Sequence, residues 1–253
     1  MNSLSGSSVQ PVSGQYIFTD LHANFPALKA VLDIIRAEGC DAVFHTGDAI
    51  AIGPYPVECL DLLLSEPKLE CVMGNHDAYF VEGLPRPRPE WMSEGEIIHQ
   101  QWTHRRLGSE RRSLVAKWPY GIVCEFEGVR TRFVHYGLAD SGREFVPVKR
   151  HPGAEELDRI FEGRDGELVF YGHDHWQSDQ RGRARYVNPG SLGCHKEAVA
   201  RYCVVEFRRG QYEVAHRSIE YDDASLYKTF EERAVPEREF IYGAFFGGRF
   251  DIR

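Results

Sequence analysis

Five short apolar runs in this chain each end in a cluster of polar side chains, and this repeated pattern limits the folds open to the sequence. The runs have the length and composition of buried strands. They cover residues 16–18, 42–44, 71–73, 132–134 and 168–171. Because ligand sites of layered α/β folds lie at the carboxyl ends of their strands, we expect the five polar clusters to lie close together.

The clusters are made of side chains that bind metal ions or transfer protons. In chain order they are Asp20-Leu21-His22, Gly47-Asp48, Gly74-Asn75-His76-Asp77, His135 and Gly172-His173-Asp174-His175. Each cluster alone is also typical of an ordinary loop, because an aspartate after a strand commonly caps a turn or helix. A single histidine at a strand end is equally typical of simple packing. The order and number of the clusters favour the metal interpretation.

The spacing of apolar residues predicts alternating strands and helices first and hairpins later. Strands are expected over 15–19, 41–46 and into Gly74, with helices over 24–38 and after the turn at 53–56. This order is typical of a parallel sheet covered by helices. Further on, the pattern predicts hairpins over 122–126 with 129–135 and over 201–207 with 212–219, a helix over 153–163, and strands over 168–171 and 185–188. We therefore expect an α/β protein, a four-layer α/β/β/α sandwich in which two mixed sheets pack face to face between flanking helices.

The domain organisation follows from composition along the chain. Residues 1–14 are rich in Ser, Gly and Pro and are expected to form a flexible lead before a single domain over 15–253. Segment 84–118 starts with a proline-rich loop that cannot join a helix or a central strand, so it is expected to be a helical, cap-like insert. Segment 220–253 is expected to be a C-terminal helical tail.

Two helices are expected in the insert, over about 93–107 and 109–117. His99 and His104 lie on them among several arginines, which predicts a solvated face. The same basic face could also meet an anionic substrate.

Charge, cysteine usage and hydropathy argue against a nucleic-acid-coating protein, a disulfide-stabilised protein and a membrane-spanning protein. The net charge of −8 argues against a protein that coats nucleic acid. Six cysteines without a C-x-x-C pair favour a reducing cytoplasm over a disulfide framework. No apolar run approaches the ~20 residues of a membrane span, so no membrane partner is expected.

The ordered motifs D-x-H, G-D, G-N-H-D, a lone H and G-H-x-H resemble the calcineurin-like metallophosphoesterase superfamily. The small single-domain bacterial and archaeal branch, which is phosphodiesterase-like, is the nearest match. Two further stretches agree with it, Gly-Pro-Tyr-Pro at 53–56 and Asn-Pro-Gly-Ser-Leu-Gly at 188–193. The resemblance covers roughly residues 15–245 and therefore nearly the whole chain.

The resemblance implies two divalent transition-metal ions, with manganese expected first and iron, zinc or nickel as alternatives. One ion would take Asp20, His22, Asp48 and His175. The other would take Asp48, Asn75, His135 and His173, so that Asp48 bridges the pair. The implied activity is a binuclear phosphoesterase, a phosphodiesterase or phosphatase that hydrolyses a small phosphate ester by attack of a metal-bound hydroxide.

Five residues are expected to act beside the metal ligands. His76 directly follows the expected ligand Asn75 and is the candidate proton donor to the leaving oxygen. Asp77 is expected to hold the tautomer of His76, although a helix-cap role is an equal alternative. Asn24 and Asn188 are expected to orient ligands, and Tyr55 to lie near the substrate.

The substrate does not follow from the resemblance, because the chain departs from the family pattern around the pocket. Ala23 and Tyr136 stand where glycine is common, and Asp174 stands where threonine is usual. Two other functions are open: a scaffold of the same fold that binds protein partners, and a nuclease. The intact ligand set and His76 favour the enzyme, and the acidic charge argues against the nuclease. The oligomeric state is left open.

Overall fold

Two mixed five-stranded sheets form the centre of the computed structural model, which describes residues 14–163 and 166–248. The first sheet has the order β10 (Gln211–Glu220), β9 (Val199–Arg208), β1 (Gln15–Phe18), β2 (Ala42–His45) and β3 (Leu69–Cys71). The second has the order β4 (Gly121–Phe126), β5 (Val129–Val134), β6 (Leu168–Phe170), β8 (Arg185–Asn188) and β7 (Ser178–Arg181). Most of the expected lead, residues 1–13, and the end of the tail, 249–253, lie outside the described residues.

Alternation along the strands explains why the two sheets face each other. In β1, Ile17 points into the core between the sheets, whereas Tyr16 and Phe18 point toward the helices on the outer face. The inner core also contains Phe44 and Phe133, whose rings stack with centroids 3.7 Å apart. Each sheet therefore buries both faces, which requires a further layer on each side.

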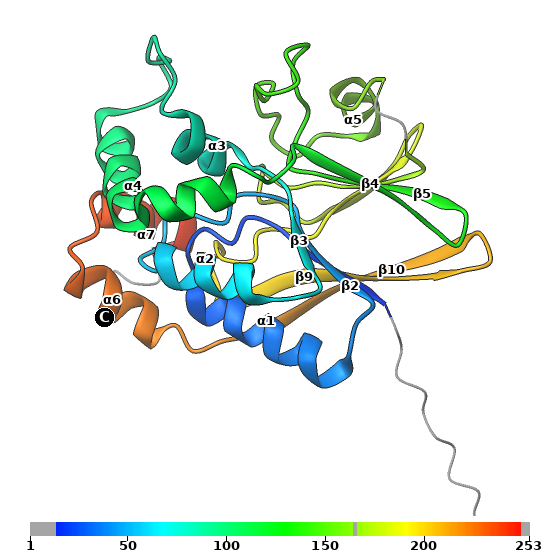
Figure 1. Cartoon of the computed structure of the whole chain (residues 1–253), viewed down its shortest axis with the longest axis horizontal. Coiled ribbons are helices and arrows are strands. Elements are labelled where there is room, and N and C mark those ends of the chain that lie inside the picture. The colour runs from blue at the N-terminus through cyan, green and yellow to red at the C-terminus, as the bar shows by residue number, and fades with distance from the viewer. Residues whose placement is uncertain (1–13, 164–165, 249–253) are drawn as a thin grey trace, which may run out of the picture.

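Helices supply those outer layers (Figure 1). α1 (Phe25–Glu38) and α2 (Pro56–Ser65) pack on the first sheet through a continuous apolar cluster. α5 (Ala154–Ile160) covers the second sheet, where Leu157 packs with Val169 and Tyr171. The expected four-layer α/β/β/α architecture is confirmed.

Strand directions also match the expectation, with one strand missed. β1, β2 and β3 are parallel, and β4 with β5 and β9 with β10 form the two expected hairpins. β7 was not expected, because Ser-Asp-Gln-Arg carries no apolar alternation and pairs only at the sheet edge. β3 ends at Cys71, so the loop that carries the third polar cluster begins at Val72.

The insert and the tail pack against each other (Figure 1). The insert is α4 (Glu94–Val115), which follows α3 (Asn75–Glu82) and bends at Gly108, where φ is +71°. The tail is α6 (Ala224–Glu232) and α7 (Arg238–Phe246). The expected solvated face is wrong for His99, which is buried and lies 3.1 Å from the Pro236 carbonyl between α6 and α7.

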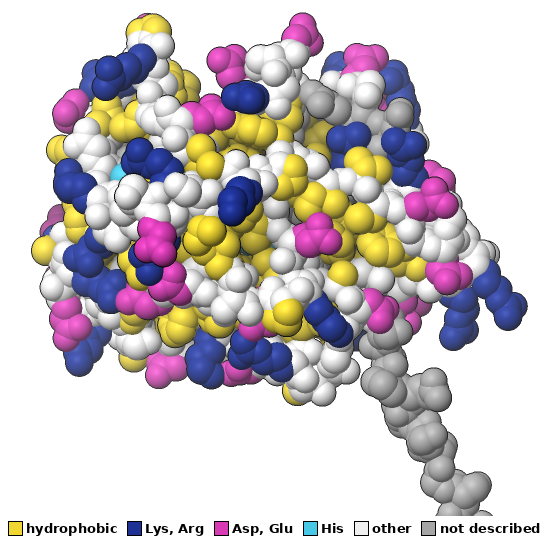
Figure 2. Space-filling view, in the orientation of Figure 1, with side chains coloured by type: hydrophobic (Ala, Val, Ile, Leu, Met, Phe, Trp, Pro, Cys, Tyr) yellow, Lys and Arg dark blue, Asp and Glu magenta, His cyan; other side chains and the backbone are white. Residues whose placement is uncertain are grey.

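The surface carries charges of both signs. On the face seen in Figure 2, Lys and Arg side chains are interspersed with Asp and Glu around apolar patches. Among the described residues, none of the helices has the length and apolar character needed to cross a membrane.

Candidate metal centre

The loops that follow the strands contact one another at the candidate site. At two positions, Gly74 and Gly193, the backbones lie so close together that only glycine fits. Hydrogen bonds join Asp20 N–H to the Gly47 carbonyl and His22 N–H to the Asp48 carbonyl, both at 3.0 Å. A Cβ on Gly74 would overlap the backbone nitrogen of Asp48, and one on Gly193 would overlap the Leu21 carbonyl oxygen. The polar clusters are therefore held against one another by backbone contacts.

Five of the seven expected ligands have left-handed backbone. The φ angles are +51° at Asp20, +47° at His22, +59° at Asp48, +75° at His173 and +59° at His175. For a residue other than glycine, such a conformation costs about 1–3 kcal/mol, and it persists at sites where the surrounding structure imposes it. The sharp turn at each strand end aims these side chains inward, toward one another.

Asp48 lies at the middle of the site. Its Oδ2 is 3.3 Å from His135 Nε2, 3.8 Å from His22 Nε2 and 4.0 Å from His76 Nε2. Two sets of potential ligand atoms, each within 4.8 Å of one another, share this carboxylate: Asp48 with His22 and His76, and Asp48 with His135 and His173. A carboxylate common to two sets is the arrangement that a bridging ligand requires.

On one side of Asp48, three candidate nitrogen and oxygen ligands meet. His135 Nε2 lies 3.0 Å from Asn75 Oδ1 and 3.2 Å from His173 Nδ1. Asn75 is the first residue of α3, His135 follows β5 and His173 follows β6, so three elements deliver them to one point. These are the ligands expected for the second ion.

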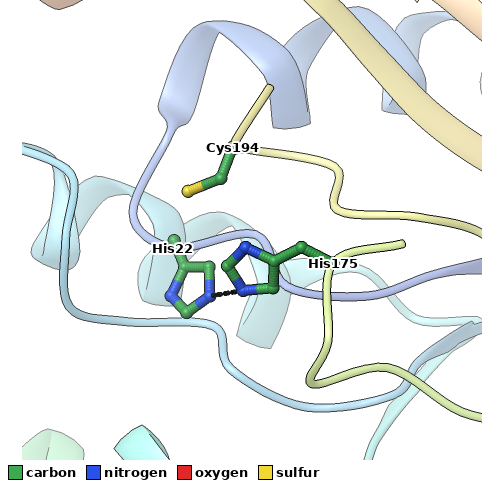
Figure 3. A group of neighbouring side chains, drawn as sticks. All are labelled: His22, His175 and Cys194. Atoms are coloured by element: carbon green, nitrogen blue, oxygen red, sulfur yellow. Dashed lines mark hydrogen bonds between the residues drawn. The ribbon is translucent and has the colours of Figure 1, made fainter. Parts of the chain in front are cut away.

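On the other side, His22 and His175 face each other with their Nε2 atoms 2.9 Å apart (Figure 3). Asp20 Oδ1 lies 3.7 Å from His175 Nε2 and 3.9 Å from His22 Nε2. The Sγ atom of Cys194 lies within 4.8 Å of ligand atoms of both histidines. Sequence reasoning missed Cys194, because nothing in the local sequence places the 188–193 loop against His22.

The chemistry of these donors fits a divalent cation. His135 Nδ1 lies 2.9 Å from the Thr46 carbonyl and donates its proton there. Its Nε2 then faces two acceptors, Asn75 Oδ1 at 3.0 Å and Asp48 Oδ2 at 3.3 Å. His22 Nδ1 likewise lies 3.3 Å from the Ile50 carbonyl, which directs its Nε2 lone pair toward His175. Lone pairs that converge in this way need a proton or a metal ion between them.

The pKa shifts report the same electrostatics in the metal-free protein. Burial raises the pKa of Asp20 to about 8, and the charge of Asp48 adds to this rise. Burial opposes a charge on His135, but the carboxylate of Asp48 raises its pKa to about 9. Burial lowers the pKa of His173 to about 3 and that of His175 to about 4. His173 and His175 are therefore neutral, which is the state in which an imidazole binds a metal, whereas His135 would release its proton when an ion binds.

Asp77 does not hold the ring of His76. It has the alternative, helix-cap role, because its carboxylate accepts the Gly74 N–H at the start of α3, and it also fixes the neighbouring backbone. Its carboxylate accepts hydrogen bonds from the amides of Asp48 at 2.9 Å, Gly74 at 3.0 Å and Ala49 at 3.1 Å. The side chain within hydrogen-bond distance of His76 is Gln100, whose Nε2 lies 2.5 Å from Nδ1. Sequence reasoning missed Gln100, which comes from α4 in the insert.

The three remaining expected residues have different surroundings. Asn24 caps α1 and donates to the Gly193 carbonyl at 2.8 Å, so it ties the D-x-H loop to the 188–193 loop. Asn188 donates to the Gly172 carbonyl at 3.2 Å, next to His173. The Tyr55 hydroxyl lies 2.6 Å from Thr229 in α6, which directs it toward the tail.

A pH dependence of stability follows from the raised carboxyl pKa values. Burial raises the pKa of Asp77 to about 7 as well, so folded Asp20 and Asp77 bind protons that the unfolded chain releases near pH 4. Their contribution to stability is present below pH 4 and is lost as the pH rises through about 7–8. If Asp20 is a ligand, a bound metal ion takes the place of its proton, so the stabilising effect of the ion should grow as the pH rises through the same window.

We expect the difference in thermal unfolding temperature between metal-loaded and chelator-treated protein to widen from pH 5.5 to pH 8.5. Thermal melts at four pH values with matched ionic strength measure it. A difference that stays constant or narrows would contradict the assignment of Asp20 as a ligand.

Three comparisons with known proteins bear on this site. Residues 15–210 match the calcineurin-like phosphoesterase superfamily domain. An uncharacterized protein of Methanocaldococcus jannaschii is 25% identical over 241 residues, which cover 87% of this chain and 93% of that protein. The family match spans the loops that carry the candidate ligands.

Solved structures share the fold. A hypothetical protein from Pyrococcus horikoshii superposes with a TM-score of 0.76 at 18% identity, covering 93% of this chain and 99% of that one. A metallophosphoesterase from Sphaerobacter thermophilus superposes with a TM-score of 0.66 at 22% identity, covering 88% of this chain and 95% of that one. With the family match over most of its length, and with the ordered motifs brought together at one site, this chain belongs to the calcineurin-like phosphoesterase superfamily.

Proposed function

We propose that this protein is a binuclear metal-dependent phosphoesterase that hydrolyses a small phosphate ester. The observation that carries the proposal is the position of Asp48, whose carboxylate is shared by two sets of potential ligand atoms. A bridging carboxylate between two sets is what two adjacent metal ions require, and two ions about 3.5–4 Å apart can stabilise both the attacking and the leaving oxygen.

The seven expected ligands are divided between two positions. Asp20, His22, Asp48 and His175 would hold one ion, and Asp48, Asn75, His135 and His173 the other. Bound ions would lower the pKa of a coordinated water and offset the charge of the phosphate. The chain's own contribution is to keep His173 and His175 neutral by burial and to fix the direction of His135 through the Thr46 carbonyl.

His76 is the proposed proton donor to the leaving oxygen. Its Nε2 lies 4.0 Å from Asp48 Oδ2, and its Nδ1 is held by Gln100. The ring lies within 4.8 Å of potential ligand atoms of His22 and Asp48. We assign it to the leaving oxygen and not to a metal, because its Nδ1 is engaged by Gln100 and the seven proposed ligands supply four groups to each ion without it. Its place in the first turn of α3 also puts the positive end of that helix at the site, which favours an anionic phosphate.

Asp77 is proposed to act as a positioning residue. The hydrogen bonds that it accepts from three amides fix the backbone of Asp48, Ala49 and Gly74, so the bridging carboxylate has one orientation.

The cytoplasm is the proposed compartment. Buried thiols such as those of Cys59 and Cys203 have pKa values raised by burial and are suited to a reducing environment.

Metal dependence tests the proposal most directly. The metal-stripped protein should be inactive on a panel of phosphomonoesters, phosphodiesters, dinucleoside polyphosphates and a phosphopeptide. Addition of Mn²⁺ should restore activity on at least one class and bring the metal content to two ions per chain. Elemental analysis and initial rates measure both outcomes, with Ca²⁺ as the control ion because it prefers all-oxygen sites. A protein that binds no more than one ion at saturation would overturn the binuclear assignment.

A further inference from the structure

Cys194 borders the His22–His175 side of the site. It directly follows the Asn-Pro-Gly-Ser-Leu-Gly stretch at 188–193, and no feature of the sequence indicates a role for it. Its side chain is 6% exposed, and its Sγ lies within 4.8 Å of ligand atoms of both histidines. Figure 3 shows Cys194 next to the imidazole pair, with its sulfur above His22 in this view. The position adds a soft donor to a set otherwise made of imidazoles and carboxylates.

The backbone holds Cys194 there. Gly193 N–H donates to the Asp20 carbonyl at 3.1 Å, and the Ser191 hydroxyl donates to the same carbonyl at 2.8 Å. Cys194 N–H in turn donates to Ser191 Oγ at 2.9 Å. Because a Cβ on Gly193 would overlap the Leu21 carbonyl oxygen, this loop can approach the D-x-H loop only with glycine at that position. The thiol is therefore fixed against the loop that carries His22.

We propose that Cys194 is a thiolate ligand of the metal ion held by Asp20, His22 and His175. The inference rests on the proposed function, since it needs that ion. When a metal binds, the S–H bond breaks, a sulfur–metal bond forms and one proton passes to water. For zinc, sulfur and nitrogen ligands at about 2.3 and 2.1 Å can lie up to about 4.4 Å apart, so a spacing within 4.8 Å needs only a small adjustment.

The donor set has a consequence for the identity of the ion. Thiolate and imidazole ligands suit zinc and ferrous iron, whereas manganese favours carboxylate, carbonyl and water oxygens. We infer that the ion on the Cys194 side is zinc or ferrous iron. The manganese expected from the family resemblance then applies to the other position, where Asn75 offers an amide oxygen.

The competing explanation is that Cys194 only packs. It also touches an apolar cluster that contains Ile52 and Leu226, and a buried thiol commonly behaves as a small apolar side chain. Packing alone predicts that sulfur contributes nothing to the spectrum of a bound metal. A spectroscopic test therefore separates the two explanations.

Cobalt(II) substitution of the metal-stripped full chain provides that test. The wild type should show visible d–d bands, which report that cobalt is bound, and a near-ultraviolet thiolate-to-cobalt charge-transfer band. Cys194→Ser should keep the d–d bands and lose the charge-transfer band, and Cys194→Ala serves in its place if the serine variant does not fold. Cys124→Ser, on strand β4 and half-buried, is the matched control that should keep both bands.

Metal competition gives a second readout. After dialysis against equimolar zinc and manganese, the zinc-to-manganese ratio bound by Cys194→Ser should be at least about 10-fold lower than the ratio bound by the wild type. Loss of a group that only hydrogen-bonds to a ligand already changes metal affinity roughly 10–100-fold, so loss of a ligand should change it at least as much. Wild-type d–d bands without a charge-transfer band would overturn the Cys194 proposal and leave the binuclear centre standing. Absence of any cobalt bands would overturn both.

Discussion

Replacing Asp48 with asparagine should abolish activity and reduce the metal content to at most one ion per chain. The substitution removes the charge shared by both ligand sets, while the amide keeps an oxygen for the His76 N–H that donates to Asp48 Oδ1 at 2.9 Å. Changes to groups that merely orient a ligand cost roughly 10–100-fold in affinity or activity, so loss of a shared ligand should exceed about 100-fold. Elemental analysis and turnover on the best substrate of the panel measure the two effects.

Stability distinguishes this loss from unfolding. In the metal-free protein, after the dominant effect of burial, the charge of Asp48 raises the pKa values of Asp20 and Asp77. Removing that charge relieves the repulsion with Asp20 and Asp77 but also removes the attraction that raises the pKa of His135. Because the two effects oppose each other, metal-free Asp48→Asn should melt close to the temperature of metal-free wild type at pH 8. Asp61→Asn is the matched control, because Asp61 pairs with Arg111 at the surface and should change neither metal content nor turnover. A variant that keeps two ions would refute the bridge.

His76→Ala should keep both ions and lower turnover by roughly 10²–10⁴-fold, the usual range for loss of a general acid. The effect should depend on the leaving group. An ester that releases p-nitrophenolate needs little protonation and should suffer least, whereas an ester that releases an alkoxide should suffer most. Rates on such a pair, together with metal analysis, measure the prediction.

Gln100→Leu is the companion variant. The amide of Gln100 contacts His76 Nδ1, and among the described residues no side-chain hydrogen bond joins Gln100 to an expected ligand. Turnover of the variant should therefore fall in the same leaving-group order as for His76→Ala, but by a smaller factor. Equal losses on both esters, or loss of an ion from His76→Ala, would show that His76 stabilises charge or binds metal instead of donating a proton.

Much of the candidate site follows from local sequence, because each candidate ligand lies within five residues of the end of a strand. The apolar run before Asp20 and the one before His173 fix where the strands end, and parallel pairing aligns the strand ends within each sheet. The face-to-face packing of the two sheets then brings the two sets of loops together. The hairpins were equally accessible, since Glu127-Gly128 and Arg209-Gly210 separate alternating segments by two residues.

What the sequence did not reveal depends on contacts between distant segments. Asp77 follows His76 in the chain, yet neighbouring residues on a helix do not share a face, so its carboxylate points to the amides of Asp48 and Ala49. Gln100, which contacts His76, lies 24 positions after it in the chain. His99 is buried because the tail covers it, which no pattern inside the insert indicates.

The tight crossing of the loops at Gly74 and Gly193 sets a limit on how this centre could be redesigned. Ligands at the site can be exchanged in principle, since one donor atom can replace another at a similar distance. The two glycines have no such substitutes, because any side chain there would displace the backbone of Asp48 or of Leu21. Changing the metal preference of the site would therefore mean changing donor residues while keeping Gly74 and Gly193, although neither glycine has a functional group that takes part in the chemistry.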